Sequence, residues 1–287
     1  MQYHPTQLIA KGHESLFSKA ILESLAHPQL MVGELPNSTC FKVSLPDLVA
    51  ADSAGAPLLS FNQKLGHLYE DALGKLLEDD PRFGVLKKNF QIITSERQTV
   101  GEIDFLLWDE RDQQHIHLEL AVKFYLIYQD KNEICYPGPD ARDNYGRKIT
   151  RLRKHQLQLS RHPAAAAQIE GITGSAPLRV NHLVHGIFFD HIGASDKPTP
   201  EFANPEGRRR SWLYCSELSE YFSGTKTARV LPKQLWLCEI DSDLYNALVE
   251  IPVAELLELG QQRCTMFVLE PSSEPLFLAP DHWPDQL

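Results

Sequence analysis

The spacing of apolar residues predicts a helix near the start of the chain. Apolar residues recur near the helical period over residues 14–31, and Pro28 is expected to end this helix. The following segment is punctuated by prolines, with one short helix expected near residues 45–51. This region has too little periodic apolar surface to fold alone. We therefore expect residues 1–58 to form a helical arm that packs on the main domain.

A longer apolar stripe predicts a second helix at residues 61–77. Its members are spaced like one face of an α-helix and run from Leu65 to Leu77. Glu70 lies beside this stripe, where an acid is less expected than on the open face. Taken alone, Glu70 is best interpreted as an ordinary charge with its carboxylate in water.

Alternation of apolar and polar residues predicts a β-meander after the second helix. Strand-like segments cover residues 83–95, 102–108 and 116–126. The polar connection at residues 109–114 is short, as in a β-hairpin, so the strands are expected to be antiparallel.

Two of these strands carry acids and a lysine within otherwise apolar sequence. Asp104 lies in the motif Gly-Glu-Ile-Asp, and Glu119 and Lys123 share one face of the next strand with His117. Carboxylates are costly on a half-buried sheet unless they are paired or bind a metal. Asp104 and Glu119 are therefore the leading candidates for function, while His117 is more simply explained as a hydrogen-bonded sheet residue.

The rest of the chain alternates predicted helices and strands. We expect a loop at residues 128–140, a helix at 143–160, a helical segment at 164–169, a strand at 180–189, a loop at 194–207, a helix at 208–222, a strand at 235–240, a helix at 243–259, a strand at 264–269 and an irregular tail at 270–287. Together these elements predict an α/β core at residues 59–192 and an α+β C-terminal extension of the same globule at residues 193–287.

Composition and charge exclude several classes of protein. Of the 287 residues, 43% are hydrophobic and 23% are charged, as in ordinary globular domains. The net charge of −10 argues against binding to nucleic acid or membrane by bulk charge, although a local basic groove remains compatible with it. Five dispersed cysteines indicate neither a zinc site nor a disulfide framework. Without a secretory signal or a membrane-spanning run, a cytoplasmic location is expected.

The predicted helix at residues 143–160 is locally basic. Arg147, Arg151 and Lys154 recur at helical spacing, with Lys148 and His155 beside them. Such charge runs are usually solvated faces. In an acidic chain, a basic helix directly after the carboxylate strands also favours a surface that contacts phosphates.

The carboxylates suit metal-assisted phosphodiester chemistry. Mg²⁺ prefers hard oxygen ligands and usually takes few carboxylates, which Asp104 and Glu119 would supply. Lys123 lies on the correct face to orient a water or to stabilise developing charge. Glu70 would add a further ligand if its helix packs over the sheet.

These residues carry a resemblance to a known superfamily. Gly-Glu-Ile-Asp, followed by a strand with Glu119 and Lys123, resembles the PD-(D/E)XK nucleases, and Gly66-x-x-x-Glu70 is similar to their acid-bearing helix. More narrowly, the chain resembles an uncharacterised bacterial family of unknown function grouped with that superfamily. The narrower resemblance rests on the segments 27–30, 65–70 and 119–126 and on Gln156.

The resemblance implies a restriction-endonuclease-like fold, a mixed sheet flanked by helices. It assigns Asp104 as the metal-binding aspartate, Glu119 as the second acid and Glu70 as the helix acid. It also implies Mg²⁺ or Mn²⁺ as cofactor and DNA, in preference to RNA, as substrate. The expected nucleic-acid contacts are Arg147, Lys148, Arg151, Lys154, His155 and Gln156, with Arg208–Arg210 as further phosphate contacts.

One residue departs from the superfamily pattern. The spacing Glu-x-Lys would place lysine at position 121, which is Ala121. Lys123 keeps the face but lies about 6–7 Å further along the strand. Either its side chain reaches back, or its role passes to Lys148 or Gln156, or cleavage is lost.

Other functions therefore remain open. On the same fold, the chain would serve as a nucleic-acid or protein-binding module without catalysis. Asp104 and Glu119 would otherwise form an internal salt-bridge network with Lys123 or arginines. A glycosidase that uses the two acids is least favoured, because no aromatic sugar platform accompanies them.

Overall fold

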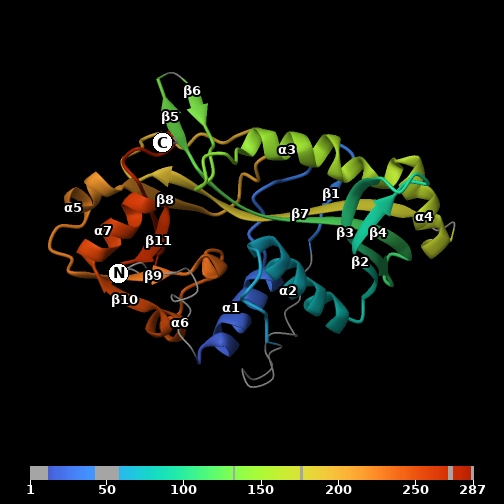
Figure 1. Ribbon diagram of the computed structural model, residues 1–287, viewed down its shortest axis with the longest axis horizontal. Coiled ribbons are helices and arrows are strands. Elements are labelled where there is room, and N and C mark those ends of the chain that lie inside the picture. The colour runs from blue at the N-terminus through green and yellow to red at the C-terminus, as the bar shows by residue number, and fades with distance from the viewer. Residues whose placement is uncertain (1–11, 43–57, 132, 175–176, 271–273, 286–287) are drawn as a thin grey trace.

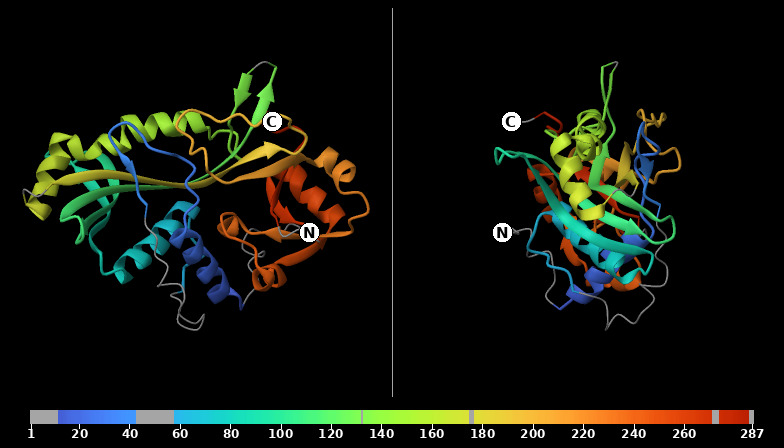
Figure 2. Two further views of the ribbon diagram at one scale, coloured as in Figure 1. Left: turned by 180° about the vertical axis from the view of Figure 1, so that it is seen from behind. Right: turned by 90° about the vertical axis from the view of Figure 1, so that its right-hand side faces the viewer.

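The chain folds into an elongated α/β structure built on one large mixed sheet (Figure 1). The computed structural model describes residues 12–42, 58–131, 133–174, 177–270 and 274–285. Helices lie on both faces of the sheet, as the view from behind also shows (Figure 2). The expected mixed sheet flanked by helices is thus confirmed.

Ten strands form the main sheet, and two more form a separate hairpin. The main sheet runs in the order β10-β9-β11-β12-β8-β7-β4-β3-β2, with β1 beside β7. The strands of the sheet are β1 (Thr39–Cys40), β2 (Phe83–Ile93), β3 (Thr99–Asp109), β4 (Gln114–Leu126), β7 (Leu178–His191), β8 (Arg209–Tyr214), β9 (Thr227–Leu231), β10 (Val249–Pro252), β11 (Thr265–Val268) and β12 (Leu276–Ala279). The hairpin consists of β5 (Tyr128–Asp130) and β6 (Glu133–Cys135).

Seven α-helices and several 3-10 turns complete the described residues. The helices are α1 (Glu14–Ala26), α2 (Leu65–Asp79), α3 (Tyr145–Lys154), α4 (Pro163–Thr173), α5 (Leu218–Tyr221), α6 (Ser242–Ala247) and α7 (Val253–Gln262). The 3-10 turns are η2 (Gln156–Arg161), η3 (Cys215–Glu217) and η4 (Lys233–Leu235). The predicted short helix at residues 45–51 falls outside the described residues.

Strand β7 is the centre of the sheet. It pairs in parallel with β4 along most of its length, with β1 at its first half and with β8 at its end. On the other side of β4, strands β3 and β2 form the expected antiparallel meander. An antiparallel hairpin can use a short connection, whereas the parallel β4–β7 pair needs the helical crossover supplied by α3 and α4.

The two faces of the sheet carry different helices. The apolar stripe of α2, including Leu68 and Leu73, is buried in the main core together with α1. On the opposite face, Ile149 and Leu152 of α3 belong to a second core cluster, which also contains Ala121 of β4. Successive side chains of β4 therefore serve both layers, because side chains alternate between the faces of a strand.

The C-terminal part differs from the predicted elements in two places where the predicted element is absent. The helix predicted at residues 208–222 is wrong, because residues 209–214 form β8, in parallel with both β7 and β12. Pairing within the sheet overrides the local pattern there. The strand predicted at residues 235–240 is also wrong: β9 ends before it, η4 covers residues 233–235, and residues 236–240 are turn and loop.

Three further segments contain strands that the sequence pattern does not predict. The predicted helix at residues 243–259 is split into α6 and α7 by strand β10, and Pro252 caps α7, where a proline is tolerated. The predicted loop at residues 128–140 contains the β5–β6 hairpin, and the predicted irregular tail contains β12. Short apolar runs such as Leu276–Ala279 become strands because the sheet offers them partners on both sides.

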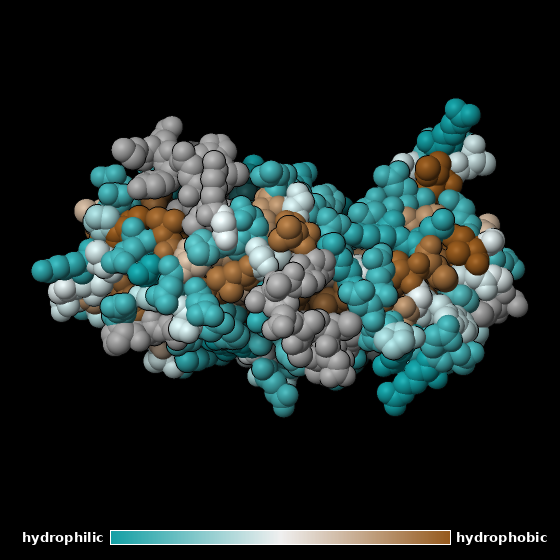
Figure 3. Space-filling model, turned by 90° about the horizontal axis from the view of Figure 1, so that it is seen from below, coloured by the Kyte–Doolittle hydropathy of each residue, from teal (hydrophilic) through white to brown (hydrophobic). Residues whose placement is uncertain are grey.

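The surface is mixed in character. Seen from below, the molecule shows apolar side chains in several separate groups on a largely hydrophilic face (Figure 3). No helix within the described ranges is long and apolar enough to cross a membrane. The five cysteines are free, and four of them are buried.

Candidate active site

The pairing between strands β3 and β4 ends next to Asp104 on β3 and Glu119 on β4. The antiparallel pairing runs from Asp109 opposite Gln114 to Phe105 opposite Leu118 and ends there. One further step in the same register would place Asp104 opposite Glu119. Instead of continuing the ladder, the Asp104 Oδ2 atom accepts a hydrogen bond from the backbone N–H of Leu120 at 2.8 Å. The two acids therefore lie where the two strands diverge, and this point, with Asp104 and Glu119, is called the fork below.

A glycine in the Gly-Glu-Ile-Asp motif lets a helical turn approach this fork. A Cβ atom at Gly101 would lie 3.0 Å from the Leu159 side chain of η2. A larger residue would push η2 away from β3. Because Gln156 opens η2, this close approach of backbone and side chain helps to place Gln156 over the sheet.

Glu119 is buried and held by two side chains. It is 1% exposed, and His117 Nε2 lies 2.9 Å from its Oε1 atom. Gln156 donates to Oε2 at 2.6 Å. Each carboxylate oxygen has two lone pairs, so both retain the capacity to accept another ligand. His117 thus orients Glu119, and its own Nδ1 atom is buried without a hydrogen-bond partner.

Lys148 of α3 is connected to Glu119 through Gln156. Lys148 donates to Gln156 Oε1 at 2.9 Å, and Gln156 in turn donates to Glu119. Burial lowers the pKa of Lys148, and the charge of Lys123 lowers it further, while Glu119 and Asp104 oppose the shift. The ammonium of Lys148 is therefore close enough to both acids to interact with their charges.

Asp104 has a strongly perturbed carboxyl group. Burial raises its pKa, and the negative charge of Glu119 raises it further, to about 8. Glu70 adds to this effect, while the Leu120 N–H and the charge of Lys148 oppose it. The carboxyl groups at the fork thus carry more negative charge than their protein neighbours compensate. Perturbed acids of this kind are concentrated at functional sites.

Glu70 lies at the edge of the fork. Helix α2 presents it within range of the Asp104 charge, and its Oε2 atom is 3.1 Å from Nδ1 of His67. The structure does not gather the three acids into a closed metal centre. Throughout the described ranges, no three His, Cys, Asp or Glu side chains are placed to hold a metal ion. Asp104 and Glu119 are the pair, and Glu70 is their neighbour.

Lys123 makes its contact away from the pair. Its Nζ atom donates to Asp143 Oδ2 at 2.7 Å, just before the start of α3. The side chain therefore ties β4 to the loop that precedes α3. Of the residues considered in place of a lysine at position 121, Gln156 contacts Glu119 directly and Lys148 reaches it through Gln156.

The basic residues of α3 divide into two groups. Arg147, Arg151 and His155 line an open groove of about 670 Å³ together with Val100 of β3. Lys154 is exposed outside this lining, whereas Lys148 and Gln156 face the acids. Val100, which lines this groove, lies four residues before Asp104 on β3.

The run Arg208–Arg210 is engaged in structural contacts. Arg208 pairs with Glu239, and Arg209 forms a two-pronged ion pair with Asp190. Arg210 is buried and donates to backbone carbonyl groups. These contacts within the fold occupy all three arginines, and the expectation that the run contacts phosphates stays a prediction.

Sequence reasoning missed two parts of this arrangement. Asp143, the partner of Lys123, lies at the start of the predicted helix 143–160, and no pattern in the sequence distinguishes it from other acids in loops. The bridge from Lys148 through Gln156 to Glu119 crosses from α3 to η2. Its signal was the placement of Gln156 among the inward apolar residues of a predicted helix, where an amide needs a partner.

Comparison with known families matches residues 21–269 to a family model described as a domain of unknown function, DUF1853. The chain belongs to this family. The match covers the fork, α3 and most of the C-terminal strands of this DUF1853 chain. No curated protein and no solved structure matches the chain. The expected membership of an uncharacterised family is thus confirmed, and the family itself assigns no activity.

Proposed function

We propose that this DUF1853 protein is a Mg²⁺-dependent nuclease of the PD-(D/E)XK type that hydrolyses phosphodiester bonds in DNA, with RNA as the second choice. The observation that supports this most is the fork, where Asp104 and Glu119 stand together and Asp104 has a pKa of about 8. A restriction-endonuclease-like arrangement of the meander and α2 belongs to the same proposal.

The donor set suits a hard divalent cation. Mg²⁺ is commonly held by one or two carboxylates, with waters and substrate phosphates as its remaining ligands. Asp104 and Glu119 would hold it, and Glu70 would bind one of its waters. The raised pKa of Asp104 supports this assignment, since a divalent cation would compensate the excess negative charge there. When bound, such an ion supplies charge stabilisation and an acidified water.

The side chains around the acids have separable roles. His117 and Gln156 fix the orientation of Glu119 from two sides. Lys148, held by Gln156, places a positive charge beside both acids, where a phosphodiester would develop additional negative charge. Burial of Lys148 strengthens this interaction because the local dielectric is lower than that of water.

The groove on α3 would receive the nucleic-acid backbone. Arg147, Arg151 and His155 line it, and it adjoins the strand that carries Asp104. Their positive charges would neutralise phosphates, although the whole chain carries a net charge of −10. The proposed substrate therefore crosses α3 and reaches the fork.

The deciding experiment is a cleavage assay on double-stranded and single-stranded DNA and on RNA, with Mg²⁺ or Mn²⁺. The expected result is metal-dependent cleavage, reduced at least about 100-fold by Asp104→Ala or Glu119→Ala, since each removes a group that acts in the transition state. Glu110→Ala, an exposed acid at the closed end of the β3–β4 hairpin, is the matched control. Absence of cleavage on every substrate would contradict the proposal.

The contact between Lys123 and Asp143 favours one second candidate. If the strand lysine is required for turnover, this chain is a nucleic-acid-binding module without catalysis. That candidate predicts salt-sensitive DNA binding that Arg147→Ala weakens, in a protein that cleaves nothing. Cleavage that depends on Asp104 would exclude it.

A further inference from the structure

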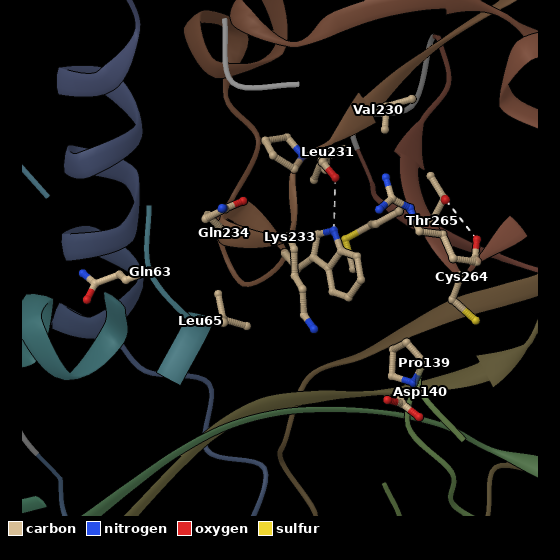
Figure 4. Close-up of a pocket in the computed structure, with 14 residues that line it drawn as sticks. Gln63, Leu65, Pro139, Asp140, Val230, Leu231, Lys233, Gln234, Cys264 and Thr265 are labelled. Carbon is tan, nitrogen blue, oxygen red and sulfur yellow. Dashed lines mark hydrogen bonds between the residues drawn. The ribbon is translucent and has the colours of Figure 1, made fainter. Parts of the chain in front are cut away.

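A cavity of about 360 Å³ opens between α2, the loop before α3 and the C-terminal strands. Figure 4 shows Leu65 on one side, Pro139 and Asp140 on another, and the strand residues Val230 and Leu231 opposite. Its volume is within the usual range for small-molecule sites. None of the roles proposed for the fork uses this cavity.

The cavity combines apolar walls with positive charge. The buried residues Leu231, Pro232 and Trp236 supply part of the apolar wall. Lys233 and Arg263 add positive charge, and Asp140 adds a negative one. The ammonium of Lys233 lies 5.6 Å from the centre of the Trp236 ring. Among the residues that the structure describes, neither Lys233 nor Arg263 forms a direct ion pair, although the charges of Asp140 and Asp143 act on Lys233.

A third cation lies behind the wall of the cavity. Arg210 is 2% exposed, donates to the carbonyl oxygen of Trp236 at 2.9 Å and has its Nε atom buried without a partner. It also lies 4.0 Å from the sulfur of Met266, another lining residue. A guanidinium in this position favours an anion in the cavity, because protein screens its charge less than water does.

Two structural elements connect the cavity with the fork. Helix α2 begins at the cavity with Leu65 and carries Glu70 five residues later. The loop that lines the cavity with Asp140 continues to Asp143, the partner of Lys123.

Lys123 stands between the two sites. It lies on the same face of β4 as Glu119, four residues or about 13 Å further along. The charge of Lys123 lowers the pKa values of both Lys148 and Lys233, after burial as the main cause. Lys123, which is itself paired with Asp143, is therefore close enough to both lysines for its charge to act on them.

We propose that this cavity is a subsite for one unpaired nucleotide of the nucleic-acid strand whose backbone passes the fork. The base would lie against the apolar wall formed by Leu231, Pro232 and the edge of Trp236, and the phosphate would contact Lys233 and Arg263. Apolar stacking with cationic phosphate contacts is how proteins hold unpaired nucleotides regardless of sequence. This inference rests on the proposed function, and it specifies a strand with a free or frayed end as the preferred substrate.

The test measures binding without cleavage. A 5′-phosphorylated hexathymidylate is titrated calorimetrically into the Asp104→Asn protein in EDTA. Lys233→Met, which removes the charge and keeps the stem of the side chain, is expected to weaken binding about tenfold. Gln234→Trp, which places a large side chain among the lining residues, is expected to do the same. Lys226→Met removes an exposed lysine of the same C-terminal part and is expected to leave binding unchanged.

The outcomes separate this inference from the nuclease proposal. Equal binding by the Lys233→Met, Gln234→Trp and control proteins, at unchanged melting temperatures, would overturn the subsite, as would absence of hexathymidylate binding. Thymidine monophosphate that binds as tightly as the hexamer would indicate a free-nucleotide site and overturn the strand assignment. Sensitivity of hexamer binding to Lys233→Met, in a protein that shows no cleavage, would retain the subsite and reject the nuclease.

Discussion

The Asp104 carboxylate accepts the backbone N–H of Leu120 at 2.8 Å, in the position where a β-ladder would have placed a carbonyl group. This contact marks the end of pairing between β3 and β4. It also explains why an acid lies so deep in the sheet, since the N–H partly compensates its burial. Neutralising the carboxyl should therefore have a measurable effect on stability.

Asp104→Asn is expected to stabilise the metal-free protein at alkaline pH. The unfolded carboxyl titrates near pH 4, whereas the folded one has a pKa of about 8. Between these values the folded state holds a proton that the unfolded state releases, so this group makes stability fall as pH rises. The melting temperature of Asp104→Asn in EDTA should exceed that of the natural protein more at pH 8.5 than at pH 5.

Divalent metal should reverse this difference. Millimolar Mg²⁺ or Mn²⁺ is expected to raise the melting temperature of the natural protein at pH 8.5, because a ligand that binds only the folded state stabilises it. Asp104→Asn should show little response, while the exposed Glu110→Gln should respond like the natural protein. Equal metal responses in all three proteins would contradict a metal site at the fork.

Lys148 should matter more for cleavage than Lys123. Lys148→Met removes the ammonium that interacts with both acids, and we expect a loss of about 100-fold in kcat/KM. Lys123→Met breaks the contact with Asp143 and should cost less than about tenfold. Steady-state cleavage rates of the two variants give the comparison. A larger loss in Lys123→Met than in Lys148→Met would contradict this prediction and indicate that Lys123 is the catalytic lysine.

The groove on α3 should determine the salt dependence of DNA binding. Each lost phosphate contact lowers the slope of log K against log salt by about 1. Arg147→Ala with Arg151→Ala is therefore expected to reduce the slope by about 2 in binding titrations from low to high salt. Arg111→Ala with Lys226→Ala, both exposed elsewhere, is the matched pair. An unchanged slope in the first pair would move the phosphate-binding surface away from α3.

Asp109 should behave in the opposite way to Asp104. It is fully buried but accepts hydrogen bonds from Arg82 at 2.8 and 2.9 Å and from Arg179 at 3.2 Å. Despite its burial, these bonds from Arg82 and those from the backbone N–H groups of Asp112 and Arg111 lower its pKa.

Asp109→Asn is expected to cost about 2 kcal/mol of unfolding free energy at pH 7, since it removes the buried charge that holds two partly exposed arginines. The stabilisation by Asp109 is present above pH 4 and is lost as pH falls through its lowered pKa. Urea unfolding at pH 7 and pH 3 tests both statements. Asp112→Asn, at a partly exposed acid that contacts the same arginines, should cost less than about 1 kcal/mol.

The sequence by itself determined the elements that carry the fork. The helical stripe of α2 and the alternation of β3 and β4 are local periodic patterns, and both depend on which face is buried. Asp104 and Glu119 stood out for the same reason, because carboxylates interrupt apolar strands only at a cost. These features could be predicted before any contact was known.

Only the tertiary structure decided which lysine accompanies the acids and where the C-terminal strands lie. Lys123 and Lys148 are equally basic in sequence, but Asp143 holds the first and Gln156 directs the second toward Glu119. Likewise, residues 209–214 become a strand because β7 and β12 pair with them. Such choices depend on partners distant in the chain, and a local pattern of apolar and polar residues does not contain them.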